Sequence, residues 1–234
     1  NIFSWSNSYP ILAWLLILEL IFIITLPISF LIFKNLPDKG YTISKTLSLL
    51  TLSITVWWIS SLKLMMFTRF SVFISIGFLS IIAVYISMKN YKKFFRFIKS
   101  QWKILLTSEI IFLIAFFGFV AVRMANPDLW HPWRGGEKPM DLAYLNAILH
   151  SSYMPPIDPW YSGGFMNYYY YGHFITSILI MGTGIIPTTA YNLAIPLFFA
   201  LVFSSSFSII YNLCEMTINK KDYKNKSFLN KFFK

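Results

Sequence analysis

Two acidic residues, Glu137 and Asp141, stand one helical turn apart in a polar stretch of the chain, with Pro139 between them. Proline suits the first turn of a helix, and one turn brings both side chains onto the same face. The helix would run to about His150, and anionic groups are favoured at its start. Two carboxylates held there suit a general base acting on an acceptor hydroxyl, or a divalent cation beside a phosphate.

A structural role explains the same pair equally well. Glu137 and Asp141 would then cap the helix and pair with Arg134 and Lys138. These two cations, together with Arg123, also suit a phosphate or pyrophosphate, because Arg offers a bidentate fork and Lys a point charge. The sequence leaves both roles open.

The histidines do not form a metal-binding motif. His131, His150 and His173 match neither HExxH nor a short paired His/Cys spacing. We therefore predict no dedicated metal site, and a divalent cation beside the carboxylates stays open as a cofactor. His131 and His173 are candidates for substrate binding.

The second half of the polar stretch is rich in aromatic residues. It contains Asp158-Pro159-Trp160 and then Asn167, which is followed by Tyr168, Tyr169, Tyr170 and Tyr171. Because 3.6 residues complete a helical turn, four consecutive side chains cannot all face lipid. Flat rings with hydroxyl tips suit carbohydrate or prenyl contacts, and an aromatic belt at the membrane interface is the alternative. Asp158, Trp160, Asn167 and the tyrosines are therefore candidate substrate-binding residues.

The surrounding chain has the composition of a membrane protein. It is 56% hydrophobic and 12% charged, with a mean hydropathy of +0.59, and its apolar stretches approach or exceed the ~20 residues that cross a bilayer core. We predict an all-α polytopic helical bundle with a long external loop, residues 125–171, that contains a juxtamembrane helix along the membrane surface. About six transmembrane helices are expected, at Pro10–Phe33, Ile43–Phe67, Ser71–Met88, Ile104–Met124, Gly172–Ile186 and Thr189–Leu213.

The positive charges predict a topology rather than a nucleic-acid partner, although the formal net charge is +11. Residues 89–103 are densely basic and lie between two apolar runs, as the positive-inside rule expects of a cytoplasmic loop. Loop 125–171 would then be extracytoplasmic. Six spans would leave the basic tail, residues 219–234, outside against the rule, unless the fifth segment is short or re-entrant or the tail leads into further helices.

Two glutamates fall within the predicted spans. Glu19 lies near the middle of the first span and Glu109 near the start of the fourth, where a charge costs about 2.5–3.5 kcal/mol on insertion scales. Each is expected to face protein, as a protonated or hydrogen-bonded group between helices or as a functional residue. The single cysteine, Cys214, excludes an intramolecular disulfide.

Several long motifs resemble those of the "YYY" integral membrane proteins of archaea and Chloroflexi. They are N-P-D-L-W-H-P-W-R-G-G-E-K-P-M-D from Asn126, P-P-I-D-P-W-Y-S-G-G from Pro155, N-Y-Y-Y-Y-G from Asn167 and L-P-D-K-G-Y from Leu36. The family is named for a YYYxG motif and has no established activity. Its members are considerably longer, which implies that this chain, beginning with Asn1 instead of Met, is an N-terminal fragment.

The order of elements is also similar to the start of GT-C glycosyltransferases. In both, a membrane helix leads into an external acidic loop, a juxtamembrane helix, an aromatic run with glycine and another membrane helix. GT-C enzymes move a sugar from a polyprenyl-phosphate carrier with an acidic residue of the first external loop, a role that Glu137 or Asp141 would fill by position. Here three spans precede the loop and E-K-P-M-D replaces an adjacent acidic pair, which leaves the identity of the base open.

The resemblance implies an N-terminal three-helix membrane unit with a basic cytoplasmic loop (residues 1–103), a GT-C-like module (104–218) and a basic tail leading into missing helices (219–234). The expected function is sugar transfer from a polyprenyl-phosphate donor at the outer face of the cell membrane, with Arg134 and Lys138 on the lipid phosphate. The rival is a transporter or a non-enzymatic membrane assembly component, with Glu19 and Glu109 on its path. The expected partners are membrane lipid and the donor, without nucleic acid; the residues predict no oligomeric state.

Overall fold

The computed structural model describes residues 4–131 and 136–232, and within them the regular elements are helices. The predicted all-α fold is confirmed. The helices are α1 (Ser4–Ser8), α2 (Pro10–Ile32), α3 (Ser44–Ser61), α4 (Arg69–Ala125), α5 (Lys138–His150), α6 (Tyr171–Thr183) and α7 (Pro187–Phe232). A single antiparallel bridge joins Ile157 to Phe165 in the loop after α5.

Three of the described helices are long and apolar enough to cross a membrane: α2, α4 and α7 over Pro187–Ile218. The protein is therefore a membrane protein with fewer separate spanning helices than predicted. The difference arises mainly at α4, because the third and fourth predicted spans and the basic segment between them form one helix of 57 residues. At about 1.5 Å per residue, α4 is long enough to pass a bilayer core twice.

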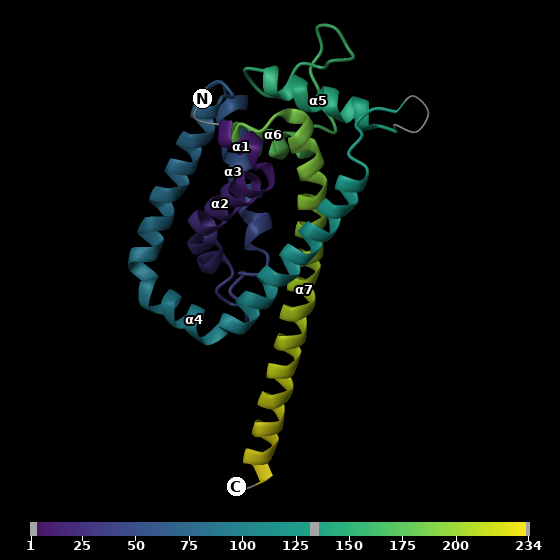
Figure 1. Cartoon of the computed structure of the whole chain (residues 1–234). Helices are drawn as coiled ribbons and strands as arrows, with labels where there is room; N and C mark the ends of the chain where they lie inside the picture. Colours follow the sequence, from purple (N-terminus) through teal and green to yellow (C-terminus); the bar gives the residue numbers. More distant parts are fainter. Residues whose placement is uncertain (1–3, 132–135, 233–234) are drawn as a thin grey trace.

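The prediction that residues 89–103 form a loop is wrong, because α4 continues through them. Between Gly77 and Gly118 the sequence contains neither Gly nor Pro, and Lys and Arg are good helix formers. Figure 1 shows α4 descending, curving at the lower end and rising again, so that its two arms flank α2 and α3. The curve is tied to the end of α2 by Phe30, whose ring contacts those of Phe94 and Phe97.

Helix α6 is too short to cross the molecule, since 13 residues extend only about 20 Å. Both of its ends lie at the α1 end of the bundle. At its start the Tyr170 hydroxyl accepts a hydrogen bond from Trp57 Nε1, near the end of α3. Beyond its end Ile186 N donates to Asn7 Oδ1 at 3.0 Å, and Gly184 adopts the left-handed conformation that stops the helix.

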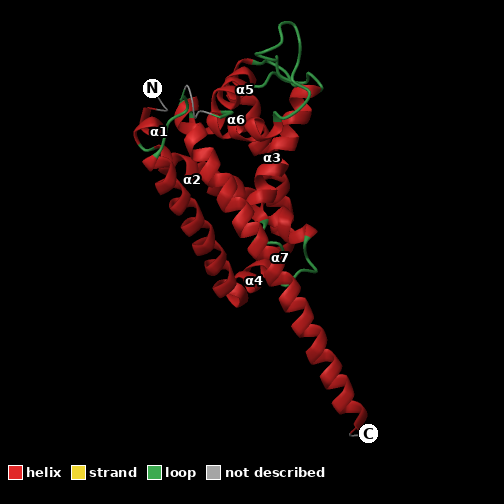
Figure 2. Cartoon of the chain, turned by 90° about the vertical axis from the view of Figure 1, so that its right-hand side faces the viewer, coloured by secondary structure: helices red, strands yellow, loops and turns green. Residues whose placement is uncertain are grey.

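The short α6 resolves the conflict over the basic tail. Because α6 does not cross, α7 starts at the α1 end of the bundle and runs to the opposite end (Figures 1 and 2). The backbone of the tail, from residue 219, therefore lies beyond the curve of α4, at the same end as residues 89–103. The short or re-entrant fifth segment was one of the two explanations that the sequence allowed.

The core is formed where α2, α4, α6 and α7 meet. Its largest fully buried side chains include Trp14, Phe112, Phe116, Phe174, Leu179 and Leu197. Helices α2 and α6 approach closely at Gly182, where an added β-carbon would lie 3.1 Å from Ile17 Cγ1. This contact fixes α6 against the bundle, and α6 in turn supports the polar loops described below.

Glu19 and Glu109 both contact Lys45, a nearly buried residue at the start of α3. The Lys45 Nζ atom lies 2.5 Å from Glu19 Oε1 and 2.8 Å from Glu109 Oε2. The Tyr41 hydroxyl donates to Glu109 at 3.0 Å, and burial, followed by the charge of Glu109, raises the pKa of Tyr41. The expectation that each glutamate faces protein is confirmed, and the partner is a cation that the sequence did not single out.

Candidate active site

Helix α5 lies across the end of the bundle and orders the polar loops around it (Figure 2). It starts at Lys138 with proline in its first turn and ends at His150, as predicted. Its apolar side chains pack inward: Leu145 and Ile148 are fully buried, and Leu142 and Leu149 are half-buried against the core. The apolar face of α5 therefore contacts the other helices.

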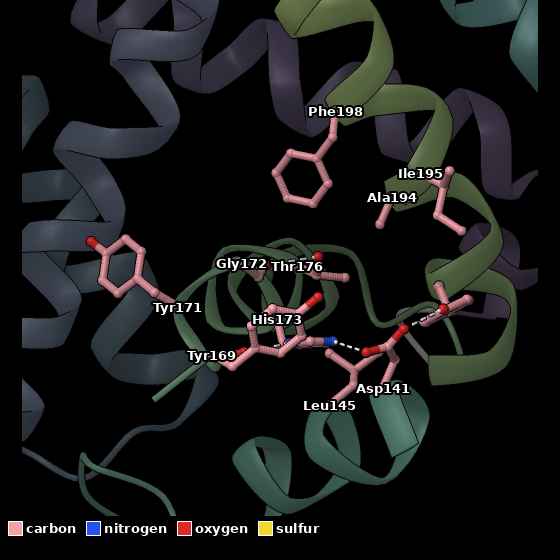
Figure 3. A pocket seen from close by; sticks show the side chains of 11 residues that line it. Asp141, Leu145, Tyr169, Tyr171, Gly172, His173, Thr176, Ala194, Ile195 and Phe198 are labelled. Atoms are coloured by element: carbon pink, nitrogen blue, oxygen red, sulfur yellow. Dashed lines mark hydrogen bonds and ion pairs between the residues drawn. The ribbon is translucent and has the colours of Figure 1, made fainter. Parts of the chain in front are cut away.

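The Asp141 carboxylate has two side-chain partners, each from another helix. The Tyr191 hydroxyl of α7 donates to Asp141 Oδ2 at 3.0 Å. His173 of α6 places its Nε2 atom 3.4 Å from Asp141 Oδ1, and both side chains are mostly buried (Figure 3). Asp141 thus joins α5, α6 and α7 at one point.

His173 is held between two acceptor oxygens. Its Nδ1 atom lies 3.3 Å from the carbonyl oxygen of Tyr169, while Nε2 faces Asp141. Its ring also contacts those of Tyr144 and Tyr169, with centroids 6.0 and 6.2 Å away. A neutral ring donates to one of the two oxygens and a protonated ring to both, so His173 can move a proton to or from Asp141 without leaving its place.

Asp141 and His173 line a cavity of about 410 Å³ between α5, α6 and α7. Tyr171 lies across this central cavity from Asp141 (Figure 3). The Tyr171 hydroxyl is 3.1 Å from Ser53 Oγ of α3, and burial raises its pKa. The wall on α7 is formed by Tyr191, Ala194, Ile195 and Phe198, whose spacing of three or four residues places them on one face.

The same face of α7 continues from the central cavity into an apolar groove of about 420 Å³. Phe198 lines both spaces. Beyond it the groove follows Leu201, Val202, Ser205, Ser206 and Ile209 of α7, opposite Thr46, Leu49 and Leu50 of α3. From Tyr191 to Ile209 this face extends about 27 Å at 1.5 Å per residue. It therefore connects the polar site with the apolar part of the bundle.

A second polar cavity of about 390 Å³ adjoins the central one, and Tyr169 lines both. Glu137, Met140 and Tyr144 of α5 form one wall, and Asp158, Met166, Asn167, Tyr168 and Tyr169 form the other. The loop around Asp158 is well ordered by hydrogen bonds: Asp158 Oδ1 accepts from the backbone nitrogens of Trp160 and Tyr161, and Met166 N donates to Pro156 O.

The tertiary structure separates the two carboxylates that the sequence treated as one pair. Asp141 lines the central cavity and Glu137 the second cavity. Helix capping accounts for neither carboxylate. Glu137 occupies the N-cap position but makes no side-chain capping hydrogen bond. Asp141 contacts Tyr191 and His173 instead.

The four tyrosines divide among three environments. Tyr168 and Tyr169 are exposed at the second cavity, Tyr170 is buried against α3, and Tyr171 lines the central cavity. Tyr169 has a φ of 68°, in the left-handed region that bulky residues seldom adopt.

The remaining candidates are Arg134, Lys138, His131, Trp160 and Arg123. Arg134 falls outside the described residues. Lys138 donates from Nζ to the carbonyl oxygen of Asp128 at 3.1 Å, and neither Lys138 nor the exposed His131 and Trp160 line the cavities described above. Arg123 Nε donates to Asn192 Oδ1 at 3.0 Å, one residue beyond Tyr191.

Sequence reasoning did not identify Tyr191, Thr176 or Phe198 as site residues. Tyr191 and Phe198 belong to an apolar span, and Thr176 resembles any small polar residue of a membrane helix. A pattern did exist, because the cavity-lining residues of α7 recur every three or four positions, but such a stripe is equally typical of helix packing. Among the described residues, no group of three His, Cys, Asp or Glu side chains is arranged to hold a metal ion.

Comparison with known proteins gives a family. A family model described as an uncharacterized membrane protein, DUF2298, matches residues 51–228. These residues include all of α4, α5 and α6, both polar cavities and the greater part of α7. No curated protein and no solved structure matches the chain. Because the match covers more than half of the sequence, the chain belongs to the DUF2298 family of membrane proteins.

Proposed function

We propose that this protein is a GT-C-like membrane glycosyltransferase that transfers a sugar from a polyprenyl-phosphate carrier. One observation carries the proposal: the Asp141 carboxylate, held by His173 and Tyr191, lines a cavity whose α7 wall continues into a long apolar groove. A lipid-linked sugar has the same order of parts, with a polar head and an apolar chain. The order of elements, which resembles the start of GT-C glycosyltransferases, supports the same function.

Asp141 is the general base in this proposal, which favours it over Glu137. The carboxylate takes the proton of an acceptor hydroxyl as the acceptor oxygen forms a bond to the anomeric carbon of the sugar. The bond from that carbon to the phosphate oxygen breaks, and polyprenyl phosphate leaves with the electron pair. Tyr191 and His173 hold the carboxylate in place, and positioning of this kind supplies a large part of enzymatic rate enhancement.

The donor's phosphate would bind beside the central cavity. The Arg123 guanidinium contacts Asn192 and lies within electrostatic range of the Tyr191 hydroxyl. A guanidinium can bind a phosphate through two parallel hydrogen bonds. Arg123 is therefore a candidate for this role together with Arg134 and Lys138, and the prenyl chain would follow the groove along α7 and α3.

The transporter hypothesis has less support than the glycosyltransferase proposal. It rested on Glu19 and Glu109 lining a path through the membrane, whereas both carboxylates are paired with Lys45. In the assembly hypothesis, loop 125–171 would serve as a gate or docking surface. Two acidic and four aromatic residues of this loop instead line two adjoining cavities: Glu137, Asp141, Tyr144, Tyr168, Tyr169 and Tyr171.

A direct test compares carboxylate variants in the full-length protein. Asp141→Asn is expected to lower sugar transfer from a polyprenyl-phosphate donor about 100-fold or more, because a positioned base contributes about 10²- to 10⁴-fold. Transfer is measured in membranes with radiolabelled polyprenyl-phosphate mannose and polyprenyl-phosphate glucose as donors. Asp128→Asn is the matched control, since Asp128 is exposed and lines neither polar cavity described above.

The Asp128→Asn protein should transfer sugar at the wild-type rate. Undiminished transfer by Asp141→Asn would remove Asp141 from the reaction. If transfer is instead abolished by Glu137→Gln and retained by Asp141→Asn, the roles of the two carboxylates are exchanged.

A further inference from the structure

The second polar cavity has a different chemical character from the central one. Its described lining carries two carboxylates, Glu137 and Asp158, and the amide of Asn167. The Glu137 carboxylate has no hydrogen bond or ion pair with any other described residue, and Asp158 uses Oδ1 for backbone nitrogens. Acceptor oxygens thus remain on both acids.

The remaining lining of this cavity consists of methionine and tyrosine side chains. Met140, Met166 and the rings of Tyr144, Tyr168 and Tyr169 face it. Sugars combine hydroxyl donors, which carboxylates and amides accept, with C–H faces that pack on aromatic rings. No cationic side chain belongs to the described lining, so among the described residues a phosphate would meet two like charges and no counter-ion. The lining suits a neutral polyhydroxylated molecule.

We infer that this second cavity binds the acceptor of the reaction, and that the acceptor presents a neutral sugar. The inference rests on the proposed transferase function, because a transferase needs a place for each of two substrates. The two cavities have similar volumes, about 390 and 410 Å³, and share Tyr169 as a wall. An acceptor hydroxyl that passes Tyr169 reaches the cavity where Asp141 and His173 lie.

Tyr169 is the residue that links the two cavities. Its carbonyl oxygen faces His173 Nδ1 at 3.3 Å, and its ring contacts those of Tyr168 and His173. Its backbone lies in the left-handed region, with φ of 68°, which is strained for a residue with a β-carbon. Strain of this kind persists where surrounding contacts fix a conformation. In this conformation the Tyr169 ring lies between the acceptor and the base.

Saturation-transfer NMR on the full-length protein in nanodiscs tests the acceptor site without requiring turnover. Maltose, cellobiose and mannobiose serve as probes. Glu137→Gln and Tyr168→Ala are each expected to weaken binding of the preferred disaccharide about tenfold, which corresponds to about 1.4 kcal/mol.

Tyr9→Ala is the matched control for Tyr168→Ala, because both rings are exposed at the same end of the molecule. The control should bind like the wild type. The acceptor site is overturned if none of the three disaccharides binds the wild type, or if binding is unaffected by both Glu137→Gln and Tyr168→Ala.

The acceptor site and the transferase can fail separately. Disaccharide binding that depends on Glu137 and Tyr168, without sugar transfer from any donor, would support the sugar site and sink the transferase. Sugar transfer that depends on Asp141, with disaccharide binding unaffected by Glu137→Gln and Tyr168→Ala, would support the transferase and overturn the acceptor site.

Discussion

The two carboxylates at the start of α5 differ in their neighbours rather than in their chemistry. Asp141 receives a hydrogen bond from Tyr191 and contacts His173, whereas Glu137 is exposed on the second cavity. A base must be held in one position to be effective. Asp141 is held and Glu137 is not, and this contrast makes Asp141 the better candidate for the base.

Substitution of Lys45 tests how much its ion pairs contribute to the stability of the bundle. Lys45→Met leaves two carboxylates without their cation, and removing one partner of a buried pair costs about 3–5 kcal/mol. We expect SDS-induced unfolding of the variant to report a loss of this size. Lys93→Met, at an exposed site on α4, should unfold like the wild type. A triple variant with Glu19→Gln and Glu109→Gln should recover part of the loss, and equal stability of the two lysine variants would contradict a structural role for the cluster.

Among the elements, α6 decides the architecture because it is short. It enters and leaves at one end of the molecule, presents His173 and Thr176 to the central cavity, and sends α7 back through the bundle. Its position depends on the close approach to α2 at Gly182. A larger side chain there would push α6, and with it His173, away from the bundle.

Gly182→Val tests this contact against Gly118→Val. A β-carbon at Gly182 meets Ile17 at 3.1 Å, whereas one at Gly118 of α4 has no atom within 4 Å. Overpacking costs about 1–3 kcal/mol, so Gly182→Val should melt at a lower temperature than Gly118→Val, as measured by thermal unfolding in detergent. Similar melting temperatures for the two variants would show that α6 adjusts without cost.

At the scale of the whole molecule, the backbone of the two most basic segments, residues 89–103 and the tail from residue 219, lies at one end. The curve of α4 and the backbone of the tail lie there, opposite α5 and the polar cavities (Figure 1). From the positive-inside rule we propose that this end lies in the cytoplasm and the cavities at the outer face. A polyprenyl-phosphate donor would then be used on the outer side of the membrane.

Cysteine labelling tests this orientation in cells. In a Cys214→Ser background, Ser162→Cys in the loop after α5 should react with a membrane-impermeant maleimide in intact cells. Ser100→Cys on the basic curve of α4 should react only after the membrane is opened; both serines are exposed. Ser227→Cys in the tail should behave like Ser100→Cys. Labelling of Ser100→Cys in intact cells would reverse the proposed orientation.

The sequence by itself determined the helical membrane fold and the start and end of α5. Both follow from local patterns, since apolar length predicts a span and Pro139 with adjacent acids predicts a helix start. The sequence also predicts a candidate site in the polar loop, with Asp141 and His173 among its candidate residues.

Only the tertiary structure decided which residues meet. The continuity of α4 was not predicted from the sequence. A run of lysines between two apolar segments suggests a loop, but lysine is also compatible with a helix. The partners of Asp141 come from α6 and α7, which lie 32 and 50 residues further along the chain. Local periodicity contains no information about such distant contacts, because they depend on how a short α6 packs against α2 and returns α7 to the bundle.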